Sequence, residues 1–225
     1  MYLSSRLVPL RYVCVEPRYW MDGIAGSRRD LVLESEAAAR LAVAAAHLSR
    51  SGGPGHDLTL LVWDAHRSSL TQRSIFDRYV EQLLVPNGKN RASAINQAKR
   101  FVSDPDSVFP HGTGGAVDVT VLIDGERAYM GTGFDSFETR AARDWYAVHP
   151  PQAAADVIAA RNRALLRAAM EAAGFVGLDS EWWHFEWGTD RWARATGHQA
   201  VLTEVLSAPP TSMPAPLCPA PEPVM

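Results

Sequence analysis

The chain has 225 residues, of which 47% are hydrophobic, and this suits one domain with a single apolar core. Its formal net charge is −3 and its pI is about 6.2, so we expect no surface for nucleic acid or for an anionic membrane. No apolar stretch is long enough to span a bilayer, and the first ten residues do not resemble a signal peptide. We therefore expect a cytoplasmic protein.

The two cysteines, Cys14 and Cys218, lie near opposite ends of the chain. A disulfide bond between them is one alternative, but two cysteines in a chain of this size do not form a disulfide framework. We expect two reduced thiols.

The first helix and the first strand have clear signals. Residues 34–50 are rich in Ala and Leu, and Gly52 and Gly53 follow as stop signals, which predicts a helix. Residues 58–63 form a short apolar run that indicates a buried strand. Polar side chains of residues 64–67 are expected at the end of that strand.

Two more helices follow, at residues 69–84 and 91–102, separated by a turn at residues 86–88. Valine-rich residues 116–123 predict a strand, and Asp124-Gly125 predicts a hairpin turn to a partner strand at residues 127–130.

The remainder predicts a loop, a helix, a strand and a tail. Residues 131–149 combine glycines and aromatics without a clean period, which indicates a functional loop. A helix is expected from Pro150 to Ala173, closed by Gly174, and a final strand at residues 183–187. Seven of the 15 prolines lie in residues 207–225, which predicts an extended or disordered tail.

This order of elements predicts an α+β fold, with a mainly antiparallel central sheet flanked by helices. We expect one catalytic domain at residues 1–206, followed by the Pro-rich tail at 207–225.

Two segments concentrate the side chains that bind metals. The first is His111-Gly-Thr-Gly-Gly-Ala-Val-Asp118, and the second is Glu181-Trp-Trp-His184. Together they offer two imidazoles and a carboxylate as ligands, with a second carboxylate as a base, which is what a hydrolytic zinc centre needs.

The spacing within each segment requires the chain to bend. His111 and Asp118 are seven residues apart, so one straight strand would point them to opposite faces, and we expect the glycines between them to allow a bend. Glu181 and His184 can converge if Glu181 lies in the turn before a strand. We expect Trp182 and Trp183 to wall the site and keep it dry. The alternative is a Gly-rich turn with a hydrogen-bonded histidine and an aromatic core strand.

Together the two segments resemble the D-alanyl-D-alanine dipeptidase family known from vancomycin resistance. The matching pattern is His111-x-x-Gly-x-Ala-x-Asp118 followed by Glu181-Trp-Trp-His184, and residues 62–67 and 130–135 match as well. The resemblance implies the zinc fold that this family shares with certain D-Ala-D-Ala carboxypeptidases and the hedgehog signalling domain.

The resemblance also implies a role for each matching residue. One Zn²⁺ is bound by His111, Asp118 and His184, with water in the fourth position. Glu181 acts as the general base, and Arg67 steadies the developing oxyanion. Asp135 holds the free amino terminus of a dipeptide substrate. The alternatives are a strand-end salt bridge between Arg67 and Asp64, and a turn-capping role for Asp135.

Three positions depart from the family pattern. Phe109 stands where Ser is usual, Thr113 where Arg is frequent, and Ser68 where Pro is common. None of them removes a ligand or the base, so hydrolysis remains the prediction, but the departures leave the exact dipeptide open.

We therefore predict a zinc-dependent D-Ala-D-Ala dipeptidase whose partner is a small dipeptide. One alternative is a D,D-carboxypeptidase that trims peptidoglycan stem peptides, against which the lack of a recognisable secretion signal counts. The other is a zinc-stabilised binding module without catalysis, in which Glu181 would have no purpose. Antibiotic resistance, self-protection and salvage of cell-wall D-alanine all use this chemistry, and the sequence indicates no oligomeric state.

Overall fold

A mixed sheet runs through the part of the chain that the computed structural model describes, residues 6–53, 55–84, 90–99 and 101–208. Only one of its strand pairs in the described residues, β2 with β4, is parallel. The predicted α+β fold with a mainly antiparallel sheet is thus confirmed. The strand order is β2 (Cys14–Val15), β4 (Leu58–Asp64), β5 (Ala116–Ile123), β8 (Glu181–Glu186) and β7 (Val176–Leu178), with β6 (Glu126–Arg127) paired to β5 and a separate pair of β1 (Leu7–Pro9) with β3 (Val32–Glu34).

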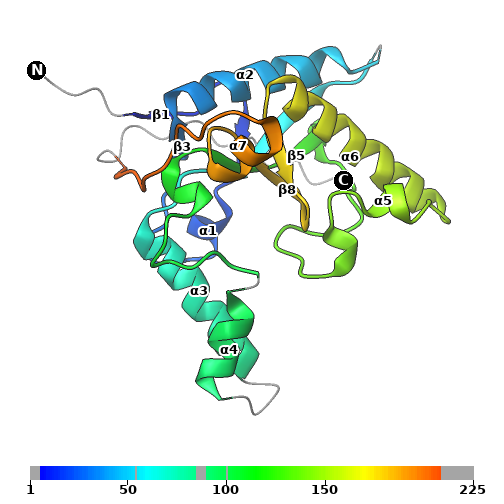
Figure 1. The fold of residues 1–225 in the computed structure, drawn as a ribbon. Coiled ribbons are helices and arrows are strands. Elements are labelled where there is room, and N and C mark those ends of the chain that lie inside the picture. The colour runs from blue at the N-terminus through cyan, green and yellow to red at the C-terminus, as the bar shows by residue number, and fades with distance from the viewer. Residues whose placement is uncertain (1–5, 54, 85–89, 100, 209–225) are drawn as a thin grey trace, which may run out of the picture.

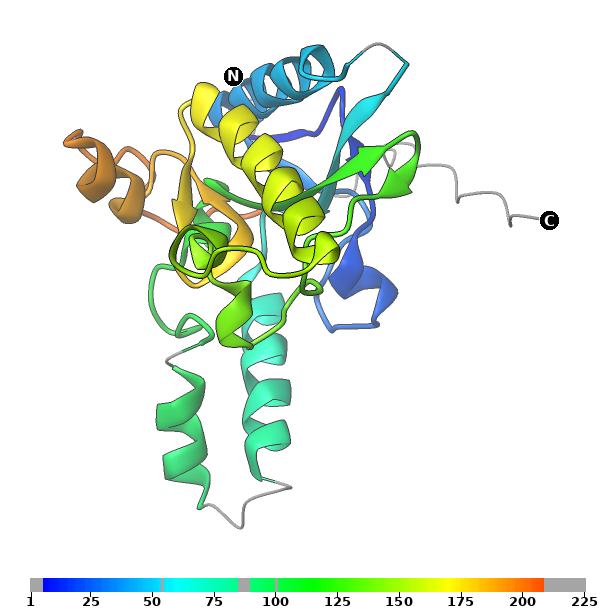
Figure 2. The same cartoon turned by 90° about the vertical axis from the view of Figure 1, so that its right-hand side faces the viewer.

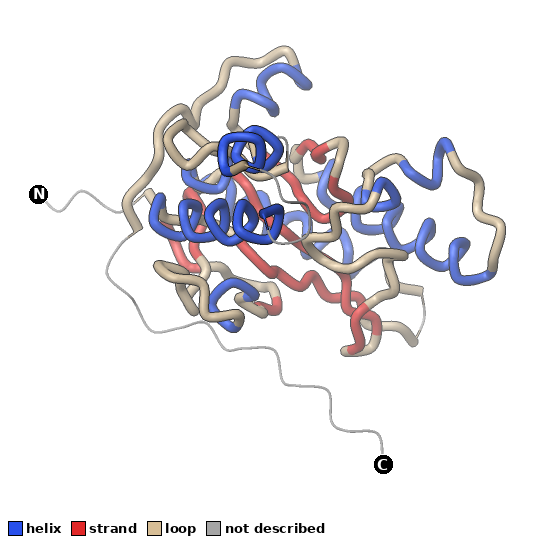
Figure 3. Tube along the Cα trace, turned by 90° about the horizontal axis from the view of Figure 1, so that it is seen from below, coloured by secondary structure: helices blue, strands red, loops and turns tan. Residues whose placement is uncertain are grey.

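Two long helices, α2 (Ser35–Arg50) and α6 (Ala154–Ala172), pack against each other over the sheet (Figures 1 and 2). The buried residues of α2 recur at helical spacing, so they form one apolar face. This face joins the valines of β5 and the buried face of α6 in one core. Seen from below, the strands lie between helices on either side (Figure 3).

Two further helices, α3 (Ser69–Leu84) and α4 (Arg91–Ala98), form a hairpin that projects from the body (Figures 1 and 2). A small apolar cluster around Phe76 and Val80 holds the hairpin together. The other helical segments are short: α1 (Arg18–Met21), η1 (Pro110–Thr113), η2 (Thr139–Ala141), α5 (Trp145–Val148) and α7 (Asp190–Thr196).

Most of the predicted elements are confirmed, and four differ in extent. The helix expected at 91–102 ends at Ala98, and the hairpin partner of β5 is residues 126–127 rather than 127–130. The helix expected from Pro150 begins at Ala154, because Pro151 disfavours a helical conformation at the residue before it. The last strand is residues 181–186 rather than 183–187.

Two predictions fall on residues outside the described part of the chain: the turn at 86–88, and the tail apart from its first two residues. The expectation of reduced thiols is wrong for Cys14, which is disulfide-bonded, while Cys218 lies outside the described residues. None of the helices in the described ranges has the length and apolar character that a membrane span requires.

Candidate metal centre

Three neighbouring strands place three polar side chains in one row. Asp118 on β5 is opposite Asp64 on β4, and it is also opposite His184 on β8. Residues directly opposite in a sheet point to the same face, so the three side chains gather there. All three side chains are buried. A buried carboxylate is unusual unless it has a partner, so contacts of Asp64 and Asp118 are expected.

His111 joins this row from a turn before β5. Pro110 begins the short 3₁₀ helix η1, and Gly114 ends it in the left-handed region at φ 74°. A Cβ on Gly115 would lie 2.5 Å from the carbonyl oxygen of Trp187, so only glycine lets the two backbones approach this closely. The predicted glycine-dependent bend is confirmed, and it takes the form of a 3₁₀ turn.

The row and the turn bring three donor atoms to one point. His111 Nε2 lies 3.2 Å from His184 Nδ1, and Asp118 Oδ1 lies 2.9 Å from the same nitrogen. His111 Nε2 and Asp118 Oδ1 are 3.4 Å apart. Two imidazole nitrogens and a carboxylate oxygen form a donor set that zinc accepts, and three protein donors leave one coordination position open.

A second layer of contacts fixes the two histidine rings. His111 Nδ1 lies 2.6 Å from the carbonyl oxygen of Ala65 and 3.1 Å from Asp64 Oδ2. His184 Nε2 lies 3.1 Å from Glu186 Oε1. Such contacts select the tautomer that presents the other ring nitrogen to a metal.

Sequence reasoning missed Glu186, although a signal was present. Glu186 is two residues after His184 on the same strand, and residues two apart share a face. Burial lowers the pKa of His184, but its hydrogen bonds to Asp118 and Glu186 outweigh burial and raise that pKa to about 10. Thr189 Oγ1 and Arg191 Nε in turn donate to the Glu186 carboxylate, at 2.5 and 3.0 Å.

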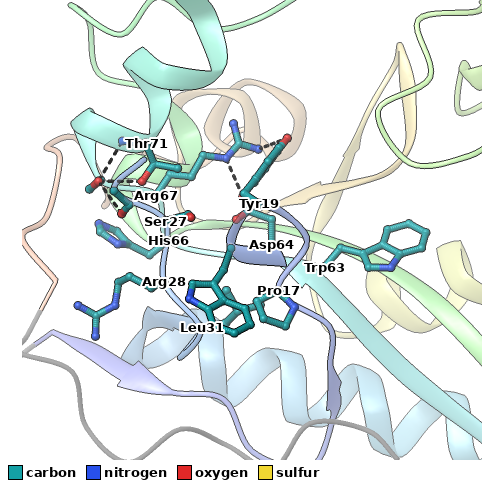
Figure 4. Close-up of a pocket in the computed structure, with 13 residues that line it drawn as sticks. Pro17, Tyr19, Ser27, Arg28, Leu31, Trp63, Asp64, His66, Arg67 and Thr71 are labelled. Atoms are coloured by element: carbon teal, nitrogen blue, oxygen red, sulfur yellow. Dashed lines mark hydrogen bonds and ion pairs between the residues drawn. The ribbon is translucent and has the colours of Figure 1, made fainter. Parts of the chain in front are cut away.

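Arg67 lies beside the donor atoms, at the end of β4. Its Nε donates to Asp64 Oδ2 at 2.7 Å, so the salt bridge considered from the sequence is present. Its Nη2 donates to Asp118 Oδ2 at 3.3 Å. Gln72 accepts from Nη1, and the ring of Tyr19 lies 4.8 Å below the guanidinium. Figure 4 shows Arg67 between Tyr19 and Asp64.

Asp135 lies in the loop before η2 and contacts Tyr19 beside Arg67. Its backbone has a φ of 55°, which non-glycine residues rarely adopt, and its Oδ2 accepts a hydrogen bond from Tyr19 Oη at 2.8 Å. Burial, with the charge of Asp118, raises the pKa of Asp135 to about 6 despite the nearby Arg67. Tyr19, on α1, carried no recognisable signal in the sequence.

Glu181 is the first residue of β8, so its expected place in the turn before the strand is wrong. The pairing of β7 with β8 is irregular here: Gly177 is opposite Phe185, whereas Leu178 is opposite Glu181. This irregularity resets the alternation of the strand and brings Glu181 to the cavity that contains His184. Burial raises the pKa of Glu181 to about 7, aided by Asp118 and Asp135 and opposed by His184.

One cavity of about 130 Å³ contains all six residues singled out from the sequence. They are Arg67, His111, Asp118, Asp135, Glu181 and His184. Its apolar wall is formed by Phe109, Phe101 and Phe137 with Ile75 of α3. The cavity therefore combines a polar floor with an aromatic wall.

The expected wall of Trp182 and Trp183 is wrong, because neither residue lines this cavity. Trp182 donates to Thr132 Oγ1 and contacts Trp63 and Trp183 edge to face. Phe109, which departs from the family pattern, does line the cavity. Thr113 does not, and its hydroxyl instead bonds to the Pro110 carbonyl within η1.

This arrangement on an α+β scaffold defines a metal-dependent hydrolase: three buried donors, an adjacent carboxylate with a raised pKa, and a small cavity that contains them. Sequence comparison gives the family, since the model of the D-ala-D-ala dipeptidase family matches residues 8–201. The chain belongs to this family, which is a family of zinc metallopeptidases.

Curated relatives agree with the family match. The D-alanyl-D-alanine dipeptidase of Escherichia coli is 30% identical over 80% of this chain and 77% of its own length. That of Streptomyces coelicolor is 32% identical over 73% of this chain and 80% of its own length. The relative from Synechocystis is 29% identical over 63% of this chain and 66% of its own length.

Two solved structures are also similar. The vancomycin-resistance D,D-pentapeptidase VanY, in complex with Zn(II), is 15% identical with a TM-score of 0.47, over 85% of this chain and 91% of that one. VanYB in complex with D-alanine-D-alanine is 16% identical with a TM-score of 0.47, over 76% and 81%. The family membership, which rests on the sequence matches, confirms the predicted enzyme class and the predicted zinc.

Proposed function

We propose that this chain hydrolyses D-Ala-D-Ala or a closely related dipeptide, and that His111, Asp118 and His184 hold the zinc. The observation that carries the proposal is the single cavity in which three buried donors lie with Glu181 and Asp135. The curated relatives that are similar to this chain bear the name of the same activity.

Glu181 is the general base in this proposal. Zinc held by His111, Asp118 and His184 would act as a Lewis acid and would lower the pKa of its bound water to about 7. The Glu181 carboxylate takes a proton from the attacking water and delivers it to the nitrogen of the leaving amine. Its pKa of about 7 suits both transfers, because a catalytic group works best when its pKa is near the working pH.

Arg67 stabilises the oxyanion that develops on the scissile carbonyl. Its guanidinium is fixed by Asp64 and Gln72, so little reorganisation accompanies the reaction. A preorganised charge in a closed site lowers the barrier more than a mobile one in water. The salt bridge to Asp64 therefore supports this role.

Asp135 holds the ammonium group of the substrate. Its side chain lines the cavity, and a hydrogen bond from Tyr19 fixes the orientation of its carboxylate. A peptide extended at its amino end has no free ammonium group to place beside Asp135. This selects dipeptides and argues against the alternative of a carboxypeptidase acting on stem peptides.

A non-catalytic zinc module fits the site less well. The Glu181 side chain makes no hydrogen bond to any described residue, and burying a carboxyl group without a partner lowers stability. A site that only stabilised the fold would gain from a fourth ligand and would have no use for this carboxyl.

A panel of peptides tests the proposal. Zinc-loaded protein is incubated with D-Ala-D-Ala, L-Ala-L-Ala, N-acetyl-D-Ala-D-Ala and D-Ala-D-Ala-D-Ala, and free alanine is measured. We expect release from D-Ala-D-Ala and little from the acetylated peptide or the tripeptide. Cleavage of the acetylated peptide at the same rate contradicts the role of Asp135. A protein with bound zinc that releases alanine from none of them is not this enzyme.

The biological setting is a separate part of the proposal. We propose residues 1–206 as the catalytic domain and a role in cell-wall D-alanine metabolism or antibiotic resistance. The location expected from the sequence is cytoplasmic. Disulfides are rare in reducing compartments, so the bonded state of Cys14 favours an oxidising one instead. Fractionation of cells that express the tagged protein, with thiol labelling of each fraction, decides between the two.

A further inference from the structure

A continuous series of contacts runs across the floor of the cavity. It begins at the carboxylate proposed to hold the substrate's ammonium group and passes through the donor atoms. At the far side it ends on a guanidinium that has no role so far. The series, in order of contact, is Asp135, Tyr19, Arg67, Asp118, His184, Glu186 and Arg191.

The two ends of this series carry opposite charges. Asp135 contacts Tyr19 at one end, and Arg191 contacts Glu186 at the other, with Asp118 and His184 between them. Both end residues line the same cavity. A free dipeptide also carries opposite charges at its ends, with the scissile bond between them.

Arg67 and Arg191 are the arginines among the described residues that line the cavity. Four of the five N–H groups of Arg67 donate to Asp64, Gln72, Asp118 and Tyr19, which leaves one N–H on Nη1 for the oxyanion. Arg191 donates through Nε alone, which leaves both of its Nη nitrogens without a hydrogen bond to any described residue. Its side chain is 37% exposed, so a ligand can reach it.

We propose that Arg191 binds the carboxylate of the substrate through its Nη nitrogens. This inference rests on the proposed function and adds to it the residue that recognises the second end of the dipeptide. Glu186 holds the guanidinium of Arg191 through Nε. The two Nη groups are therefore free to form a charge-assisted pair with a carboxylate. Asp135 and Arg191 together then require a substrate that is charged at both ends.

Arg191 has an alternative role as a positioning residue that acts only through Glu186. In that case it neutralises the Glu186 carboxylate and steadies the ring of His184, without touching substrate. The two roles differ in one measurable respect: only direct binding depends on whether the substrate ends in a carboxylate.

The test compares D-Ala-D-Ala with its C-terminal carboxamide, D-Ala-D-Ala-NH₂, using zinc-loaded wild type and Arg191→Gln. Wild type is expected to prefer the free acid. In Arg191→Gln we expect the KM for the acid to rise about 10- to 100-fold, the range for a hydrogen bond to a charged group. We expect kcat/KM for the carboxamide to change less than about 2-fold, so the preference for the acid disappears. Arg191→Lys is expected to recover part of it, because a point charge replaces the fork.

Arg194→Gln is the matched control, since Arg194 lies exposed on the same helix and outside the cavity. Zinc content and thermal unfolding are measured for every variant. Equal losses on both substrates, or no loss on the acid, overturn the role of Arg191. The proposed function fails in a different way, when zinc-loaded wild type cleaves neither substrate. In that case the contact with the substrate's carboxylate is still measured by calorimetric titration. D-Ala-D-Ala is titrated into zinc-loaded Glu181→Gln and into the double variant that also carries Arg191→Gln. Equal affinities for the dipeptide overturn the role of Arg191.

Discussion

The site has a strand-borne half and a loop-borne half, and the two differ in how they are held. Asp118 and His184 are directly opposite each other on central strands, where their positions follow from the register of the sheet. Asp135 and Tyr19 come from a loop and a four-residue helix, and Asp135 has a strained backbone. In our proposal the first half carries the chemistry and the second the recognition of the amino end. Substitutions in the strands should therefore affect metal binding or kcat, and those in the loops should affect KM.

The largest effect is expected for Glu181→Gln. Removal of the base should lower kcat by about 10²- to 10⁴-fold, the contribution of general acid–base catalysis, while zinc content stays at one per chain. Metal analysis with single-turnover kinetics measures both quantities. A variant with bound zinc and undiminished kcat assigns the base to another residue.

Glu186→Gln tests the carboxylate that contacts His184 through Nε2, on the side of the ring away from the other donor atoms. Loss of a carboxylate that orients a metal-bound histidine typically costs about 10- to 100-fold in metal affinity. Competition with a chelator gives the affinity, and saturating zinc should restore most of the activity. Failure of zinc to rescue the variant indicates that Glu186 is needed for folding rather than for the metal. Glu204→Gln, at an exposed carboxylate, is the control.

Asp135→Asn tests the loop-borne half. We expect the KM for D-Ala-D-Ala to rise about 10- to 100-fold with kcat little changed, because one charged hydrogen bond is lost. The pKa of Asp135 is about 6, so below pH 6 the wild type should lose affinity as this carboxylate protonates. A pH series of KM checks the sign. The same rise in KM at low pH in the variant assigns the titration to another group.

The smallest effect concerns stability. An acid whose pKa is raised from 4.5 to about 7 on folding penalises the folded state once it ionises. This penalty is absent below pH 4.5, grows as the pH rises to 7, and is fully present above it. At pH 8 the free energy of unfolding of metal-free Glu181→Gln should therefore exceed that of wild type by about 3 kcal/mol, with no difference at pH 4. Urea denaturation at both pH values measures this difference, and equal stability at pH 8 contradicts the unfavourable burial of this carboxylate.

Sequence reasoning reached the strand-borne half more completely than the rest. His111 and Asp118 lie in a short motif whose glycines signal a bend, and His184 lies in a second short motif with Glu181, so local patterns suffice for these ligands. Tyr19 lies 116 residues from Asp135 and 48 residues from Arg67, so only the fold brings them together. Arg191 lies five residues from Glu186, and the turn between β8 and α7 sets this contact. Trp182 and Trp183 were misplaced because the irregular pairing of β8 was not predictable from spacing.

Within the series of contacts, the part from Arg67 to Arg191 is a strip of alternating charge that passes through Asp118, His184 and Glu186. Removing one member of such a strip leaves its two neighbours buried and unbalanced, so the measured loss exceeds what that member contributes in the intact array. Effects of neighbouring substitutions will then not add, and the neutral pair Glu186→Gln with Arg191→Gln should be closer to wild type in stability than either single change. The charges of these residues therefore balance as a set rather than in separate pairs.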